Sequence, residues 1–224
     1  MTPTFIAVAM SFMLLANAIN AQVFPSLPAG NQVVHFGLGL DPAILLTVGY
    51  AQSQHGWVPN RSHILISEIA LPFQLDLRDY RLKFGVQSSV IRTRHLDVSA
   101  TISVVTRGTV NSIHRATNFG TDVILLLGCY GRFGSLAGEI GLDKGWLTHI
   151  RHSNWYRTYI FSNAKDGWYA NTASTFHYGL RAGLRIGRAE IIFRAGINNS
   201  GSFSELFLPL YAVLGLNYHF LGTR

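Results

Sequence analysis

A strict two-residue hydrophobic period covers the last part of the chain, from Leu208 to Phe220. Its even positions, which include Leu214 and Tyr218, are all apolar, whereas its odd positions are smaller or more polar. Successive side chains of a β-strand point to opposite faces, so this pattern predicts a strand with one apolar face. A tilted strand of about 9–11 residues crosses a bilayer. The segment is long enough to do so.

The same period recurs along the chain, and charge separates cleanly between the two faces. Apolar positions alternate in segments 34–40, 44–50, 65–73, 80–90, 96–104, 119–129, 136–142, 176–186 and 189–197. The opposite face carries the charged residues Glu68, Arg81, Lys83, Asp97, Asp122, Glu139, Asp143, Arg181, Arg185, Glu190 and Arg194. Asp41-Pro42 is a turn signal, but the period runs through it, so a hairpin and one long kinked strand both fit. We therefore predict about ten strands, with eight as the alternative.

Composition decides what kind of β protein this pattern describes. Only 13% of the 224 residues are charged, against about 25% in an average soluble domain. Mean hydropathy is +0.23, yet no segment after the N-terminus approaches the roughly 18 apolar residues of a membrane helix. Only helices and closed barrels satisfy the backbone in lipid. Alternation alone also fits a soluble sandwich, but the low charge and the long strands favour an all-β, transmembrane, antiparallel up-and-down β-barrel.

The ending of the final strand carries a resemblance. Alternating apolar residues that finish in Tyr218-x-Phe220 resemble the terminal signal strand of Gram-negative outer-membrane β-barrel proteins. The resemblance implies that the barrel-assembly machinery recognises the strand Gly215–Phe220. It also implies residence in the cell outer membrane, in contact with lipid and lipopolysaccharide.

The N-terminal segment has the features of a secretory signal. Residues 5–16 are almost all apolar and are followed by small residues, so cleavage fits after Ala18 or after Ala21. No Lys or Arg precedes Arg61, so the usual basic start is missing. We predict a signal peptide at 1–21, a periplasmic lead-in at 22–32 and a barrel at 33–220.

Connections between the predicted strands alternate in length. Segments 107–118, 144–173 and 199–206 are long and are separated by short turns, as in barrels with long outer loops and short periplasmic turns. This order predicts three extracellular loops, although 52–62 is also long. A lumen of about ten strands is narrow, so we expect its charges to pair with one another and to leave no open pore.

The connection 144–173 is the richest in polar and aromatic side chains. The first hypothesis is a non-catalytic surface that binds sugars, lipid headgroups or a partner through its aromatic rings and charges. The predicted binding residues are Arg151, Trp155, Arg157, Lys165, Asp166, Trp168 and Tyr169. The formal net charge of +7 suits lipopolysaccharide phosphates. Nucleic acid is not expected, because the basic residues are spread through the strands.

A second hypothesis is a hydrolase. His152-Ser153-Asn154 resembles, in part, the His-x-Ser-Asn motif of outer-membrane lipid A deacylases. That resemblance implies a catalytic Ser153 with His149 or His152 as its base. The sequence departs from the motif, because Arg151 stands at the histidine position and His152 is adjacent to the serine. A serine nucleophile also needs an orienting acid, which Glu139 or Asp143 could supply.

A third hypothesis is a metal or proteolytic site made by His149, His152 and Asp166. His-x-x-His brings two imidazoles together on a helical turn but not on a strand. Asp143, His149 and Asp166 also loosely resemble the rim residues of omptin-type proteases, which are ten-stranded barrels. We predict neither a bound metal nor a cofactor.

Overall fold

The structure, a computed structural model, describes residues 30–40, 44–55, 62–93, 96–131, 133–200 and 210–220. The predicted signal peptide and most of the lead-in lie outside these residues. The described residues form ten strands and one short helix. Their bounds are β1 Gln32–Leu40, β2 Ile44–His55, β3 Ser62–Pro72, β4 Tyr80–Arg92, β5 Asp97–Val110, β6 His114–Tyr130, β7 Gly134–His152, α2 Asn154–Tyr159, β8 Gly167–Ile186, β9 Ala189–Ser200 and β10 Leu210–Phe220.

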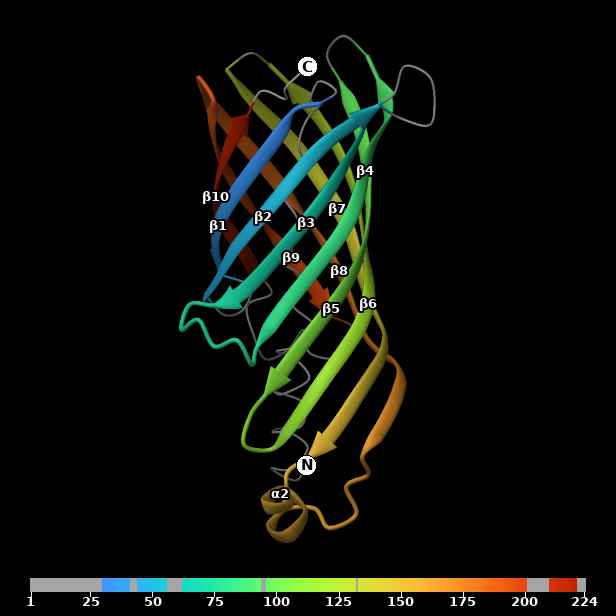
Figure 1. Cartoon of the computed structure of the whole chain (residues 1–224). Coiled ribbons are helices and arrows are strands. Elements are labelled where there is room, and N and C mark those ends of the chain that lie inside the picture. Colours follow the sequence, from blue (N-terminus) through green and yellow to red (C-terminus); the bar gives the residue numbers. More distant parts are fainter. Residues whose placement is uncertain are drawn as a thin grey trace.

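The ten strands close into one antiparallel up-and-down barrel (Figure 1). Each strand pairs with its neighbours in the chain, and β1 pairs with β10 to close the sheet. Val34 lies opposite Tyr218, and Leu40 lies opposite Ala212. β1 and β2 are separate antiparallel strands, so ten strands are confirmed and the alternative of eight is wrong. The described strands run from Gln32 to Phe220.

The two ends of the barrel differ. Gln32 and Phe220 lie at one end with the short β6–β7 and β8–β9 turns. The other end, which we call the α2 end, carries the β5–β6 and β7–β8 connections and α2 (Figure 1). β7 and β8 are the longest strands, with 19 and 20 residues. The predicted long loops on this side therefore do lie at one end of the barrel.

Two of those predicted loops are much shorter than expected. β5 continues to Val110 and β6 begins at His114, so 107–118 is a tight hairpin and not a loop. β7 continues to His152 and β8 begins at Gly167, so the connection is 153–166 and not 144–173. Backbone pairing continues beyond the apolar stretch of each strand. Strands predicted from the hydrophobic pattern are therefore too short at this end. β9 runs to Ser200, and the rest of the predicted loop 199–206 lies outside the described residues.

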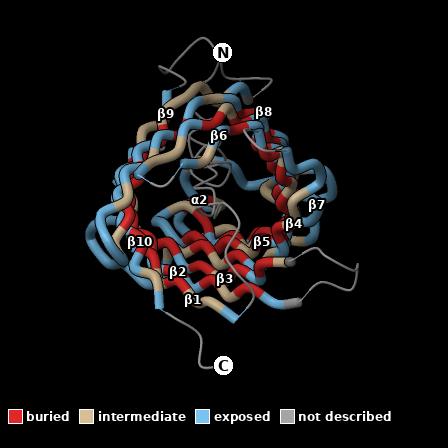
Figure 2. The backbone as a smooth tube through the Cα atoms, turned by 90° about the horizontal axis from the view of Figure 1, so that it is seen from above, coloured by how far each residue is buried: buried red, intermediate tan, exposed pale blue. Residues whose placement is uncertain are grey.

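Most large apolar side chains face outward from this barrel and the charged side chains of its wall face inward, although the inner face also holds small apolar clusters around Ile64 and Ile124. Along β6 and β10, buried and exposed residues alternate almost without interruption (Figure 2). Exposed positions include Ile102, Leu125 and Leu180, whereas Lys83 and Asp122 are completely buried. The predicted division into an apolar face and a charged face is confirmed. The apolar face lies outside and the charged face inside, which is the reverse of the arrangement in a soluble protein.

Two glycines make room for histidine rings inside the barrel. Gly49 pairs directly with His35, and Gly141 pairs directly with His177. A Cβ atom at either glycine would overlap the imidazole across from it. Both histidines are fully buried.

Among the described residues, no helix has the length and hydrophobicity to cross a membrane.

Candidate functional site

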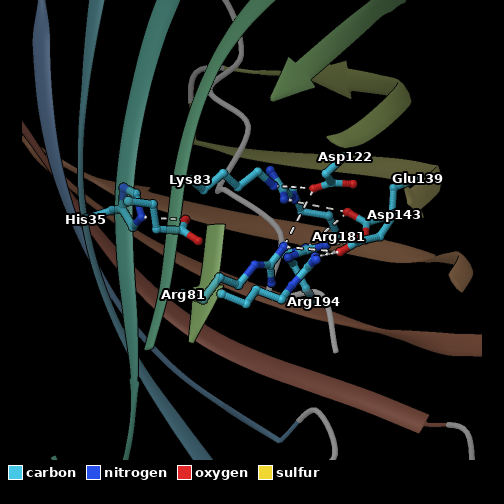
Figure 3. A network of polar contacts seen from close by, with 10 residues as sticks. His35, Arg81, Lys83, Asp122, Glu139, Asp143, Arg181 and Arg194 are labelled. Carbon is cyan, nitrogen blue, oxygen red and sulfur yellow. Dashed lines mark hydrogen bonds and ion pairs between the residues drawn. The ribbon is translucent and has the colours of Figure 1, made fainter. Parts of the chain in front are cut away.

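The interior of the barrel is lined by paired charges, and Glu139 on β7 is the most heavily engaged acid. It accepts hydrogen bonds from Arg194 Nε at 3.0 Å, from a second nitrogen of the same guanidinium, and from Tyr211 Oη at 2.6 Å. A nitrogen of Arg181 lies 3.6 Å away (Figure 3). Charge-assisted bonds of this kind are the strong ones. One carboxylate therefore joins β7 to β8, β9 and β10.

A second group of charges joins β4, β5, β6 and β7. Lys83 pairs with Asp122, and Arg107 pairs with Asp143. Arg81 lies between the two acids, 4.0 Å from Asp122 and 3.5 Å from Asp143 (Figure 3). All five side chains are buried. Burying a charge is costly unless it is paired, and here each charge has a partner.

Further pairs continue the pattern around the barrel. His35 on β1 contacts Glu68 on β3 at 3.1 Å. At the end opposite α2, Glu190 accepts a hydrogen bond from Asn217 at 3.1 Å. Most of the interior contacts join two strands that are separated in the sheet by at least one other strand. The predicted lattice of interior charges is therefore present.

Arg107 is an interior residue that the sequence analysis missed. It donates to Asn118 Oδ1 at 2.9 Å as well as pairing with Asp143. The loop lengths predict a loop at 107–118, which contains this residue. Extending the β5 alternation from Ser103 would have placed Arg107 on the inner face, so the signal was present.

At the α2 end, Asp166 organises the β7–β8 connection. It accepts the His152 backbone N–H at 2.8 Å and lies 3.0 Å from His152 Nδ1. Arg157 of α2 pairs with its other oxygen. The backbone hydrogen bond from His152 and the Arg157 side chain lower the pKa of Asp166 to about 2. The carboxylate is therefore ionised at neutral pH and ties the connection to the end of β7.

Ser153 serves as the N-cap of α2. Its hydroxyl accepts the backbone N–H of Tyr156 at 3.2 Å, which satisfies one of the free amides of the first turn. Its own backbone N–H donates to the carbonyl of Ile113 in the β5–β6 hairpin at 2.8 Å. Ser153 therefore joins two connections at the α2 end.

The two candidate histidines lie on opposite faces of β7. His149 faces outward and packs against Trp168, with ring centroids 4.9 Å apart. His152 stacks on Tyr156 at 5.4 Å and pairs with Asp166. In the described part of the chain, no hydrogen bond joins Ser153 to either histidine. The described residues also contain no group of three or more side chains suited to a metal ion.

The predicted binding residues fall into two groups. Arg157 and Asp166 are engaged with each other, whereas the other five are exposed on the surface of the α2 end. Trp168 is 62% exposed and Trp155 is 53% exposed. The α2 end therefore exposes aromatic side chains, and the Arg157–Asp166 pair holds the β7–β8 connection beside them in place. The exposed group comprises Arg151, Trp155, Lys165, Trp168 and Tyr169.

A pocket that the sequence did not reveal lies at the same end, between the β3–β4 connection and the β5–β6 hairpin. Its volume is about 330 Å³. Arg78, Tyr80 and Thr117 line it, together with Gly108 and Arg115. Gly108 has Tyr80 directly across from it, and a Cβ there would meet the tyrosine ring. The pocket combines two guanidinium groups with an aromatic ring.

Comparisons with known proteins give no family for this chain: no family model matches it, and no curated protein is significantly similar to it. Its function is therefore inferred from its own residues.

Proposed function

We propose that this chain is an outer-membrane β-barrel with a closed interior, which acts without catalysis through the surface of its α2 end. Its role would be to bind lipopolysaccharide or an envelope partner, or to support the envelope as a structural component. The observation that carries the proposal is the inverted distribution of polarity. Charges lie inside the barrel and large apolar side chains lie outside.

The outward apolar surface needs a partner. Soluble monomers rarely expose contiguous apolar patches of more than a few hundred Å². Here exposed Phe, Leu, Ile and Val side chains occur on every strand, including Phe36, Phe84, Val104, Leu142 and Phe193. A lipid bilayer would cover such a belt, and a closed barrel leaves no unpaired strand edge within it. The predicted signal peptide and the Tyr218-x-Phe220 ending agree with this location.

The interior supports a barrel that does not conduct. Arg81, Lys83, Arg181 and Arg194 extend into the interior, but each meets a carboxylate within 4.0 Å. Side chains fill the interior of barrels of about eight strands, whereas aqueous channels have 16–18. The paired charges therefore serve to hold the wall together.

The α2 end supports the binding role. Trp155, Trp168 and Tyr169 are exposed, and such rings stack on sugars or lie at membrane interfaces. Lys165 and Arg151 are exposed beside them. This surface requires no catalytic geometry.

The membrane location can be tested with two matched substitutions on β5. Ile102 lies near the middle of the strand and is 62% exposed, whereas Val110 ends it at the α2 end. In a bilayer, Ile102→Arg should cost about 2–4 kcal/mol of folding free energy and Val110→Arg about 0–1 kcal/mol. Urea unfolding in phospholipid vesicles measures both, and cell fractionation reports the location. Equal and negligible costs, with the protein recovered from the soluble fraction, would reject the proposal.

A lipid A hydrolase is the second candidate, because His152 is paired with an acid. The 3.0 Å contact between His152 Nδ1 and Asp166 is the kind of contact that orients a catalytic imidazole. Mass spectrometry of lipid A from cells expressing the wild type and Ser153→Ala decides between the two candidates. Loss of an acyl chain with the wild type alone would support the hydrolase. Identical spectra would support the non-catalytic role.

A further inference from the structure

We infer that the pocket formed by Arg78, Tyr80, Gly108, Arg115 and Thr117 binds a phosphate group carried by a glycolipid of the surrounding leaflet. This inference rests on the proposed outer-membrane location and names a specific site and ligand class for it. It concerns the outward wall of β4–β6, not the β7–β8 connection that contains α2.

The first observation is a group of exposed arginines at the α2 end. Arg115 on β6 lies directly opposite Arg151 on β7, and both side chains are exposed on the outward face. Like charges directly opposite each other on a sheet are destabilising. Among the described residues, no ion pair involves Arg115, Arg151 or Arg78. An anion bound to the Arg115 guanidinium would weaken its repulsion of Arg151.

The second observation is the pocket itself. Arg78 comes from the β3–β4 connection and Arg115 from β6, but both line the same volume of about 330 Å³. Gly108 and Thr117 are cross-strand partners. Because glycine has no side chain and that of threonine is small, they leave space between Arg78 and Arg115. The Thr117 hydroxyl adds a hydrogen-bond donor to the two guanidinium groups. Guanidinium groups bind phosphate oxygens through paired N–H donors.

The third observation is the order of residues along neighbouring strands. Outward positions of β6 run from Leu125 and Val123 through Phe119 to Arg115 toward the α2 end. On β4 they run from Phe84 to Tyr80, with Arg78 just beyond the strand. Apolar, aromatic and basic side chains therefore follow one another. A lipid leaflet has the matching order of hydrocarbon, interface and charged headgroup.

This order favours a lipid-linked phosphate over a free one. A free anion would be recognised by the charges alone, whereas a glycolipid would also contact the apolar and aromatic positions below them. The occupant we propose is therefore a phosphorylated glycolipid, with its acyl chains along β4–β6 and a phosphate between Arg78 and Arg115.

The test measures binding of purified lipopolysaccharide to the full-length barrel folded in non-ionic detergent. Arg78→Gln/Arg115→Gln should weaken binding at least tenfold, because each charge-assisted hydrogen bond to phosphate contributes to affinity. Thr117→Phe fills the pocket without changing the charge and should weaken binding similarly. Lipopolysaccharide from which the phosphates have been removed should bind the wild type as weakly as the unmodified ligand binds the double variant.

The matched control is Arg92→Gln/Arg188→Gln, which removes two exposed charges at the opposite end of the barrel. Equal weakening by this control would overturn the inference, because attraction would then be non-specific. Unchanged binding by both pocket variants would overturn it as well. Full competition by inorganic phosphate at the lipid's own affinity would reject a lipid source. Fractionation of the same variants keeps the two questions separate: a barrel in the outer membrane with an unaffected pocket refutes only this inference.

Discussion

Neutralising Glu139 should destabilise the barrel more than any single change at its surface. In Glu139→Gln, the side chain keeps its size but loses its charge and one acceptor oxygen. Arg194 and Arg181 would then remain buried with too few acceptors, and the new amide would present a donor to other donors. Glu139 is 2% exposed and Arg194 is 1% exposed, so water cannot compensate easily.

The size of this effect follows from the contacts. Removing one member of a buried ion pair typically costs about 3–5 kcal/mol, a large share of the roughly 5–15 kcal/mol by which native proteins are stable. Changing Arg194 to Met in the same protein removes the buried cation that loses its carboxylate partner. The double variant should therefore be less destabilised than the sum of the single variants, by about 0.5–3 kcal/mol.

Urea unfolding in phospholipid vesicles, followed by tryptophan fluorescence, measures these free energies. Asp97→Asn is the control. Asp97 is itself buried, but its partner Arg92, 3.8 Å away, has a side chain that is 61% exposed. Water can therefore solvate Arg92 when the pair is lost, so this variant should cost less than one that leaves a cation buried. If Glu139→Gln costs no more than Asp97→Asn, water reaches the interior and the reasoning for a closed barrel fails.

Two further predictions concern the wall and the α2 end. Gly141→Ala should destabilise the barrel, because the new Cβ would overlap the His177 ring. Gly138→Ala should be as stable as the wild type, because the nearest neighbour of its Cβ lies 4.0 Å away. Thermal unfolding compares the two variants, and equal midpoint temperatures would contradict the close approach of Gly141 to His177. The pKa of Asp166 is about 2, below its unfolded value, so its stabilising contacts should be complete above about pH 4 and disappear as the pH falls through about 2. A carboxyl-carbon NMR titration checks this, and Arg157→Gln should raise the midpoint; a midpoint already near 4 in the wild type would refute the pairing.

The extent of the strands shows where the sequence pattern stops being informative. Within the apolar belt, residues such as Leu82 and Phe84 alternate with Arg81 and Lys83 and make a strand evident. Toward the α2 end, polar and apolar side chains mix on both faces of β6 and β7, with Ala116 and Ile150 buried on the inner face, although the backbone ladder continues. A bulge between Gly145 and Leu147 also shifts the register. Trp146 and Leu147 are consequently both exposed, and a period of two is lost at that point.

The sequence by itself determined that this chain forms long strands with an apolar and a charged face, because alternation is a local property of each segment. Closure of the sheet decided which face lies inside, since a sandwich with the opposite orientation has much the same alternation. Closure also decided the partners of each charge. Lys83 meets Asp122 and Arg194 meets Glu139 across an intervening strand. Arg78 of the β3–β4 connection and Arg115 of β6 line one pocket. Such contacts depend on strand order, register and curvature, which no single segment contains.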